Sequence, residues 1–209
     1  MNSLILVDIQ NDFLPGGALA VPNGHEVIPV ANLLIAKKNK LFDLIVATQD
    51  WHPKNHGSFA SNNPGKRVGD IGNLGGVDQV MWPDHCVQGT FGAELATALE
   101  RRQLDYVVRK GTHPEIDSYS GFFDNGHKNE TGLADYLKQS SISAVSVMGL
   151  ATDYCVKYTA LDAKDLGFDT SLVIDGSKAV NIHPDDEKRA IAELMQAGVN
   201  IVNSQELLK

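Results

Sequence analysis

Three residues of this sequence have the types needed for nucleophilic, covalent catalysis. Asp8, Lys110 and Cys155 each follow a short apolar run of the chain. A cysteine near a helix start and beside a lysine gains thiolate character, and an aspartate within reach can accept and deliver protons. Taken singly, a free cysteine is most often a small buried apolar residue, and a lysine that ends a strand usually reaches solvent. Only if the three lie together does the pattern predict a nucleophile, Cys155, with two partners.

A second group of side chains has the pattern of a metal site. Asp50 and His52 lie two residues apart after another apolar run, and His85 lies further along the chain. Two ligands on one turn and a distant third leave open positions on the ion, as in functional metal sites. His56 lies in the same stretch, and each histidine alone is more simply interpreted as a surface residue of a polar loop. Carboxylate and imidazole ligands together suit zinc, iron or manganese.

These side chains need a fold that gathers the ends of several strands. Apolar strand-like runs alternate with helical patterns along the chain. Strands are expected at 4–7, 44–47, 106–108, 144–148, 170–174 and 200–202, and helices at 25–38, 91–101, 132–139, 153–166 and 186–197. This alternation predicts an α/β fold with an open, doubly wound, mainly parallel six-stranded sheet and helices on both faces.

That fold carries a functional expectation, because ligands of such sheets bind beyond the carboxyl ends of the strands. Residues that can take part in catalysis or metal binding follow five of the predicted strands, and we expect them to face one crevice: Asp8, Asp50, Lys110, Cys155 and Asp175.

The stretch from about 51 to 90 breaks the alternation. It lacks periodicity and is rich in Gly, Pro and Asn. A loop this long within one compact domain is usually a binding element or a lid, and the alternative is a flexible insertion. Its histidines and tryptophans favour the first interpretation, a long loop carrying the metal site within a single domain of residues 1–209.

Composition excludes several classes of protein. The net charge of −8 argues against nucleic-acid binding, which requires a basic face. No apolar run approaches the ~20 residues that cross a bilayer, and the first residues have the pattern of a strand and not of a signal peptide. Two cysteines do not form a disulfide framework, so the cytoplasm is the expected location. Phosphate-binding glycine motifs are absent. We expect a small-molecule substrate as the partner, and the sequence leaves monomer and homo-oligomer open.

The motifs, in their order along the chain, resemble those of the nicotinamidases, a group within the isochorismatase-like cysteine hydrolases. The resemblance covers essentially the whole chain. It rests on residues 7–13 (VDIQNDF), 50–53 (DWHP), 82–87 (WPDHCV), 110–111 (KG) and 149–156 (GLATDYCV). It implies hydrolysis of nicotinamide to nicotinate and ammonia through a cysteine thioester, in NAD salvage, and activity on the related amide pyrazinamide.

The resemblance also implies roles for individual residues. It implies a catalytic triad of Asp8, Lys110 and Cys155, one divalent metal ion, preferably zinc, and a flat ring flanked by aromatic side chains. A cis peptide at Leu150-Ala151 would place the backbone N–H groups of Ala151 and Cys155 in an oxyanion hole. Relatives differ in whether they use a histidine in this loop, so His56 is either a ligand or a residue beside the ligand set, and we treat it as the latter. The implied metal ligands are Asp50, His52 and His85, and the implied ring contacts are Phe13, Trp82 and Tyr119.

Three other functions remain as alternatives. A related cysteine amidohydrolase could act on a ureido or carbamoyl amide, although the aspartate–histidine set with Trp82 suits a ring that bears a basic nitrogen. A hydrolase using metal-activated water could keep Cys155 as a structural residue, and alkylation of the thiol separates that case. A binding protein without enzymatic activity would hold metal and turn over no amide.

Overall fold

One parallel sheet organises the chain, which a computed structural model describes over all 209 residues. Its six strands lie in the order β5-β2-β1-β6-β7-β8, and every neighbouring pair is parallel. The predicted fold class and all six predicted strands are therefore confirmed. The strands are β1 (Asn2–Val7), β2 (Leu44–Asp50), β5 (Tyr106–Lys110), β6 (Ala144–Leu150), β7 (Asp169–Lys178) and β8 (Asn200–Val202).

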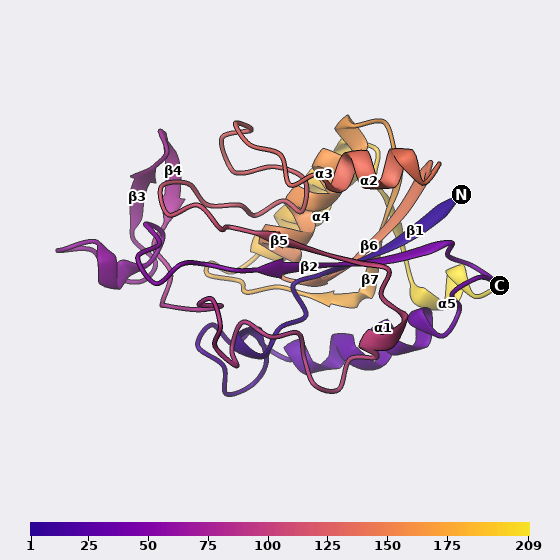
Figure 1. Cartoon of the computed structure of the whole chain (residues 1–209), viewed down its shortest axis with the longest axis horizontal. Coiled ribbons are helices and arrows are strands. Elements are labelled where there is room, and N and C mark those ends of the chain that lie inside the picture. The colour runs from indigo at the N-terminus through magenta and orange to yellow at the C-terminus, as the bar shows by residue number, and fades with distance from the viewer.

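Helices cover both faces of the sheet (Figure 1). On one face lie α1 (Val27–Ile35) and α5 (Ser204–Leu207), and on the other lie α2 (Leu133–Gln139), α3 (Lys157–Asp165) and α4 (Asp186–Gln196). Successive residues of β1 serve different faces: Leu4 and Leu6 pack in the core under α1, whereas Ile5 and Val7 pack in the core under the other three helices. Because both faces are buried, the central strands read as continuous apolar runs.

The chain reverses its direction across the sheet between β1 and β6. From β1 the chain continues to β2 and β5 on one side, and from β6 it continues to β7 and β8 on the other. The carboxyl ends of β1 and β6 therefore flank the point where an open α/β sheet forms its binding crevice. Asp8 follows the first of these strands, and Cys155 follows the second.

The predicted helix at 91–101 is wrong. The segment forms turns, and only Arg101–Gln103 forms a short 3-10 helix. Its carbonyl groups bond to the end of the sheet instead of to the next helical turn: Asn11 N–H donates to Glu94 O, and the side-chain amides of Gln10 and Gln49 donate to Ala93 O. The apolar residues at 93, 95, 96 and 99 are buried in the core, which explains the helix-like spacing of the sequence.

The segment from 51 to 90 contains an antiparallel hairpin, β3 (Ile71–Leu74) and β4 (Val77–Val80), which projects beyond the end of the sheet (Figure 1). This hairpin was not predicted, because each of its strands has only four residues. The signal was present: Gly75 and Gly76 both have positive φ, as the tightest hairpin turns require.

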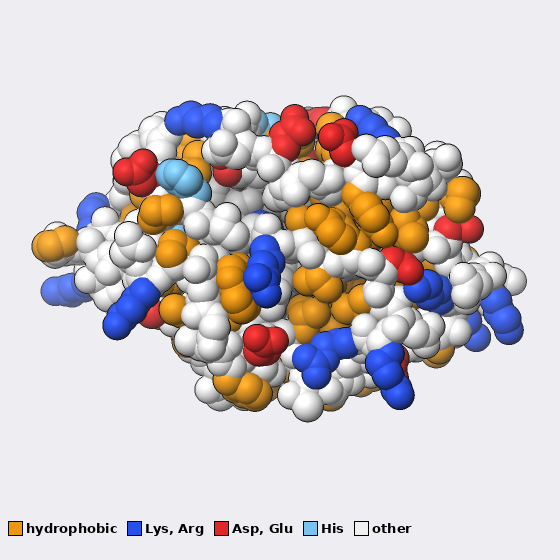
Figure 2. All heavy atoms as spheres, viewed as in Figure 1, with side chains coloured by type: hydrophobic (Ala, Val, Ile, Leu, Met, Phe, Trp, Pro, Cys, Tyr) orange, Lys and Arg blue, Asp and Glu red, His pale blue; other side chains and the backbone are white.

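Charged side chains lie mainly around the margin of the face seen in Figure 2, and hydrophobic ones gather nearer its centre. On the edge strand β5, Val107 is exposed.

Every helix is too short or too polar to cross a lipid bilayer.

Candidate active site

The acid, the lysine and the cysteine meet in the crevice. Lys110 Nζ lies 2.8 Å from Asp8 Oδ2 and 3.4 Å from Cys155 Sγ. It also donates to Asp50 Oδ1 at 2.5 Å and to the backbone oxygen of Ser118 at 2.8 Å. All of these side chains are buried. Lys110 therefore connects the other two predicted catalytic residues, Asp8 and Cys155, with Asp50 of the predicted metal site.

Local backbone geometry aims these side chains. Asp8 has a positive φ, and Thr48 on the neighbouring strand accepts from its backbone N–H and donates to its Oδ1 at 2.5 Å. After β6 the Leu150–Ala151 peptide is cis, in agreement with the resemblance, and residues Thr152–Val156 form a π-helical turn that carries Cys155 into α3. Irregular turns at the two strand ends thus point the acid and the thiol into one crevice.

The protonation states differ from the simple expectation for a nucleophilic cysteine. Burial raises the pKa of the Cys155 thiol well above its ordinary value, and Lys110 opposes this only in part. The turn and the lysine therefore do not leave a resting thiolate. Burial also raises the pKa of Asp8, to about 6, against the lowering effect of Lys110. At neutral pH Asp8 is mostly ionised, next to a protonated thiol, so it can accept the proton of the thiol.

Asp50 and Lys110 form a strongly charged pair. Burial opposes ionisation of Asp50, but Lys110 and His52 outweigh it and hold the pKa of Asp50 well below its ordinary value. Burial also acts against the charge of Lys110, yet Asp50 and Asp8 raise its pKa well above the ordinary value. Lys110 therefore remains a cation in the interior because two carboxylates surround it.

The three predicted metal ligands come together. The ligand atoms of Asp50, His52 and His85 lie within 4.8 Å of one another, and all three residues are buried. His52 Nε2 is 3.6 Å and His85 Nε2 is 3.9 Å from Asp50 Oδ2.

Hydrogen bonds show that these residues fit a metal ion. Nδ1 of His52 bonds to Gly111 O at 2.8 Å, and Nδ1 of His85 bonds to Pro83 O at 2.8 Å. Each carbonyl fixes the tautomer that leaves Nε2 as the free ligand atom, as in protein metal sites. Burial, reinforced by His52, lowers the pKa of His85 to about 4, so this imidazole is neutral and able to bind a cation at pH 7.

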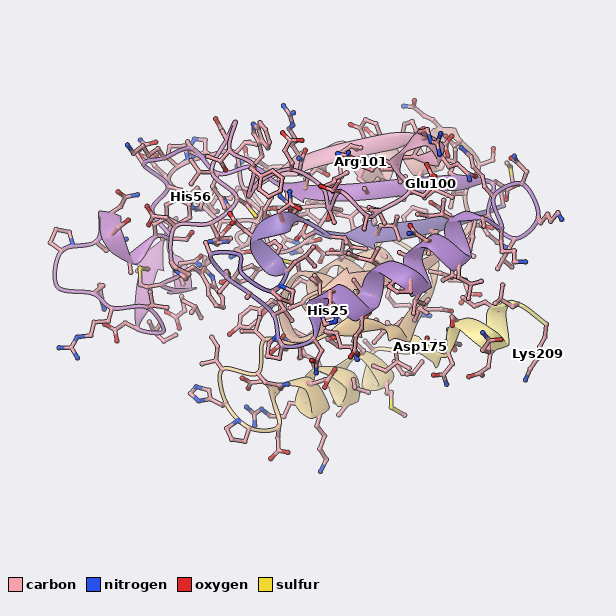
Figure 3. All side chains as sticks on the ribbon, turned by 90° about the horizontal axis from the view of Figure 1, so that it is seen from below. His25, His56, Glu100, Arg101, Asp175 and Lys209 are labelled. Carbon is pink, nitrogen blue, oxygen red and sulfur yellow. The ribbon has the colours of Figure 1, made fainter.

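His56 and Asp117 lie beside the ligand set. The rings of His56 and His52 are 4.3 Å apart, and the buried Nε2 of His56 has no hydrogen-bond partner. Asp117 can share a cation with this pair of histidines. Asp117 was not predicted as a site residue, because it lies seven residues beyond β5 in a loop without periodicity. Figure 3 shows His56 at the end of the molecule that carries the hairpin.

A cavity opens over the cluster, and aromatic side chains form its walls. Phe13 and Trp82 line it, and Tyr119 lines it with Tyr154, whose ring lies 5.4 Å from that of Tyr119. The floor of the cavity carries Cys155. The complete lining is Phe13, Leu19, Asp50, His52, Trp82, His85, Asp117, Tyr119, Ala151, Tyr154, Cys155 and Val180.

The prediction that Asp175 faces the same crevice is wrong. Strand β7 continues past this residue to Lys178, and the carboxylate of Asp175 accepts hydrogen bonds from the backbone N–H and the hydroxyl of Ser204, at 2.8 and 2.6 Å. Figure 3 shows Asp175 near α5, away from His56. An aspartate after an apolar run can anchor a following helix as well as serve a site, and the sequence does not distinguish these cases.

Comparison with known proteins gives concordant similarities over the whole chain. The isochorismatase domain model matches residues 2–206. The nicotinamidase of Escherichia coli K12 is 48% identical over 199 residues, covering 95% of this chain and 93% of that protein. A nicotinamidase/pyrazinamidase structure from Acinetobacter baumanii has a TM-score of 0.94 and 43% identity, covering 99% and 97% of the two chains. A pyrazinamidase structure from Pyrococcus horikoshii in complex with zinc has a TM-score of 0.78 and 42% identity, covering 97% and 98%.

Proposed function

We infer that this chain, which belongs to the isochorismatase family, is an amidohydrolase that converts nicotinamide to nicotinate and ammonia. The observation that carries this conclusion is Lys110 Nζ in contact with Asp8, Asp50 and Cys155 at once, beneath an aromatic cavity. The cluster places a nucleophile, a proton acceptor and a metal-ligand set around one small flat space. The similarity to nicotinamidases then specifies the amide.

The first half of the reaction forms a thioester. Asp8 takes the proton of the Cys155 thiol as Sγ adds to the amide carbonyl carbon. Backbone N–H groups of Ala151 and Cys155 are proposed to hold the developing oxyanion. Asp8 then gives its proton to the leaving nitrogen, the C–N bond breaks, and ammonia departs. Lys110 stays protonated and steadies the charge of both Asp8 and the attacking sulfur.

The second half releases the acid. Asp8 takes a proton from water as the water oxygen adds to the thioester carbonyl, and the C–S bond breaks. The sulfur recovers its proton from Asp8, nicotinate leaves, and the thiol and carboxylate return to their starting states. Atoms balance, since one amide and one water give one acid and one ammonia.

The metal ligands and the aromatic walls would together position the pyridine ring. Asp50, His52 and His85 would hold a divalent cation, which when bound supplies a Lewis acid for the pyridine nitrogen. We propose zinc, as in the complex from Pyrococcus horikoshii, with iron and manganese as the other ions that suit these ligands. Phe13, Trp82 and Tyr119 are proposed to contact the ring, as their place in the cavity lining supports. His56 is proposed to pack against the ligand His52 without binding the ion itself.

We also propose that the chain forms one domain, because the family match and the six-stranded sheet both extend across it. Segment 51–90 supplies one wall of its site and the ligands His52 and His85. Two free cysteines fit a reducing compartment such as the cytoplasm, and NAD salvage is the proposed context.

The test is ammonia release from nicotinamide by metal-loaded protein, with Cys155→Ala beside the wild type. The variant should lose turnover by about 10⁴-fold or more, as expected when a nucleophile is removed, while it keeps its metal. Near-normal turnover by Cys155→Ala would contradict the covalent mechanism. If neither protein released ammonia although both were folded and metal-bound, the substrate would be wrong, and ureido and carbamoyl amides would be assayed next.

A further inference from the structure

The hairpin sends one polar side chain into the interior. In β4 the side chain of Gln79 is buried, with a residue exposure of 1%, whereas its neighbour Asp78 is exposed. A buried side-chain amide requires hydrogen-bond partners, because leaving its donors and acceptor unpaired would destabilise the fold. Its Nε2 lies 2.8 Å from Val80 O in the same strand, and two of its other partners, Asp117 and Tyr119, line the cavity.

Gln79 Nε2 donates toward two side chains of the cavity lining. It lies 3.0 Å from Asp117 Oδ2 and 2.9 Å from the hydroxyl oxygen of Tyr119. The same hydroxyl accepts from Trp82 Nε1 at 3.2 Å. One amide therefore connects the hairpin with three residues that line the substrate cavity, two by direct bonds and Trp82 through Tyr119.

Asn125 forms a second contact with the side-chain amide of Gln79, at its oxygen atom. Asn125 Nδ2 donates to Gln79 Oε1 at 3.4 Å, and Asn125 Oδ1 accepts from the backbone N–H of Tyr119 at 2.8 Å. Backbone and hydroxyl of Tyr119 are thus both tied to the Gln79–Asn125 pair. Because burial and the nearby carboxylate of Asp117 raise the pKa of Tyr119 well above its ordinary value, the hydroxyl stays neutral and can accept these bonds.

We propose that Gln79 is a positioning residue of the substrate cavity, which holds Tyr119 and Asp117 in place and thereby sets the affinity for the substrate ring. This inference rests on the proposed function. Gln79 is outside the cavity lining and contacts none of the groups that break or form bonds. Its effect should therefore fall on KM and leave the chemical step nearly unchanged.

Two substitutions separate hydrogen-bond donation from shape. Gln79→Met keeps the length of the side chain and removes the donor, so Asp117 Oδ2 loses the hydrogen bond that Gln79 provides. Gln79→Glu keeps the shape but replaces the donor with an oxygen that faces the carboxylate of Asp117. If donation matters, Glu is worse than Met; if only packing matters, Glu is the milder change. Asp78→Asn, one residue away on the exposed side of β4, is the matched control.

The first readout is steady-state kinetics with nicotinamide on metal-loaded protein. KM should rise about tenfold in Gln79→Met and further in Gln79→Glu, with kcat within about twofold of wild type. Asp78→Asn should match wild type. Tyr119→Phe should raise KM too, and adding it to Gln79→Met should raise KM less than the product of the two single effects, because both act through one contact. Unchanged KM, or a fall in kcat at constant KM, would overturn the proposal.

The second readout needs no turnover. Trp51 and Trp82 are the two tryptophans of the chain, so in a Trp51→Phe background the emission reports Trp82 alone. Gln79→Met should shift that emission, because Tyr119 no longer sits fixed against the indole N–H, and Asp78→Asn should leave it unchanged. If wild type released no ammonia, the proposed function would fail, and the emission alone would decide the role of Gln79. No shift, or a shift seen only with loss of metal and early melting, would overturn it.

Discussion

The floor and the wall of the cavity are built in different ways. The floor consists of residues at the ends of neighbouring parallel strands, where Asp50 and Lys110 are register partners in β2 and β5. The wall comes from several separate segments, among them segment 51–90, where side-chain amides bond to backbone oxygens, as Asn62 does to His56 O at 2.9 Å and Asn63 does to Phe59 O at 2.7 Å. The floor is therefore tied to the sheet, and the wall is held by individual side chains.

Because the floor and the wall are built differently, we expect substitutions in them to affect different properties of the enzyme. A change in the floor alters groups that exchange protons or carry charge, so it should affect kcat, the metal or stability. A change in the wall alters the shape of the binding space, so it should affect KM or local order. Substitutions in the two regions can break or sharpen this comparison.

The largest effect is expected at Lys110. Lys110→Met leaves the buried carboxylates of Asp8 and Asp50 facing one another without a cation. We expect turnover to be lost and the free energy of unfolding to fall by about 3–5 kcal/mol, as when one partner of a buried ion pair is removed. Chemical denaturation and ammonia release measure the two effects. Lys188→Met, on the exposed side of α4, is the control. A stable Lys110→Met protein with normal turnover would show that the floor does not depend on this cation.

The metal site spans both regions and should show a graded response. His52→Ala removes a proposed ligand, and we expect the affinity for a divalent ion to fall by more than about 100-fold, because neighbouring changes outside the ligand set already reduce affinity about 10- to 100-fold. His56→Ala should fall in that lower range. Competition with a chelator, read by metal analysis, gives both values. Equal losses in the two variants would make His56 a ligand, and no loss in His52→Ala would refute the ligand set.

A smaller effect is expected at Thr48, which belongs to the floor without taking part in the reaction. Thr48→Val removes the hydroxyl that donates to Asp8 Oδ1, so the proton acceptor is less well aimed. We expect kcat to fall about tenfold with KM nearly constant, the reverse of the pattern at Gln79. Thr48→Ser keeps the hydroxyl and should retain most activity. If Thr48→Val changed KM alone, the division between floor and wall would not hold.

The smallest effect is expected at the hairpin tip, where Lys128 Nζ donates to Gly75 O at 2.5 Å. This bond is exposed, so Lys128→Met should change global stability by less than about 0.5 kcal/mol. Faster amide exchange confined to β3 and β4 would show that the bond orders the hairpin. Slower turnover without any change in exchange would contradict a purely local role for this bond.

The sequence allowed the floor to be predicted almost completely. Asp8, Lys110 and Cys155 follow apolar runs that are long enough to identify as strands, and parallel strands bring their carboxyl ends to one edge. The same rule failed at Asp175, where the strand continues and the carboxylate bonds to Ser204. The helix prediction at 91–101 failed for a different reason, because apolar residues spaced three or four apart can be buried by a loop as well as by a helix.

What the sequence by itself determined is therefore the sheet, the helices on both of its faces and the residues at its strand ends, because apolar runs and helical periodicity are local in the sequence. Only the tertiary structure decided which polar residues of the long segments line the cavity and which hold the lining residues in place. Gln79 and Asp117 are 38 positions apart and meet through one hydrogen bond. Nothing in the spacing of either residue marks that contact, because it depends on how a hairpin and a loop pack against the finished sheet.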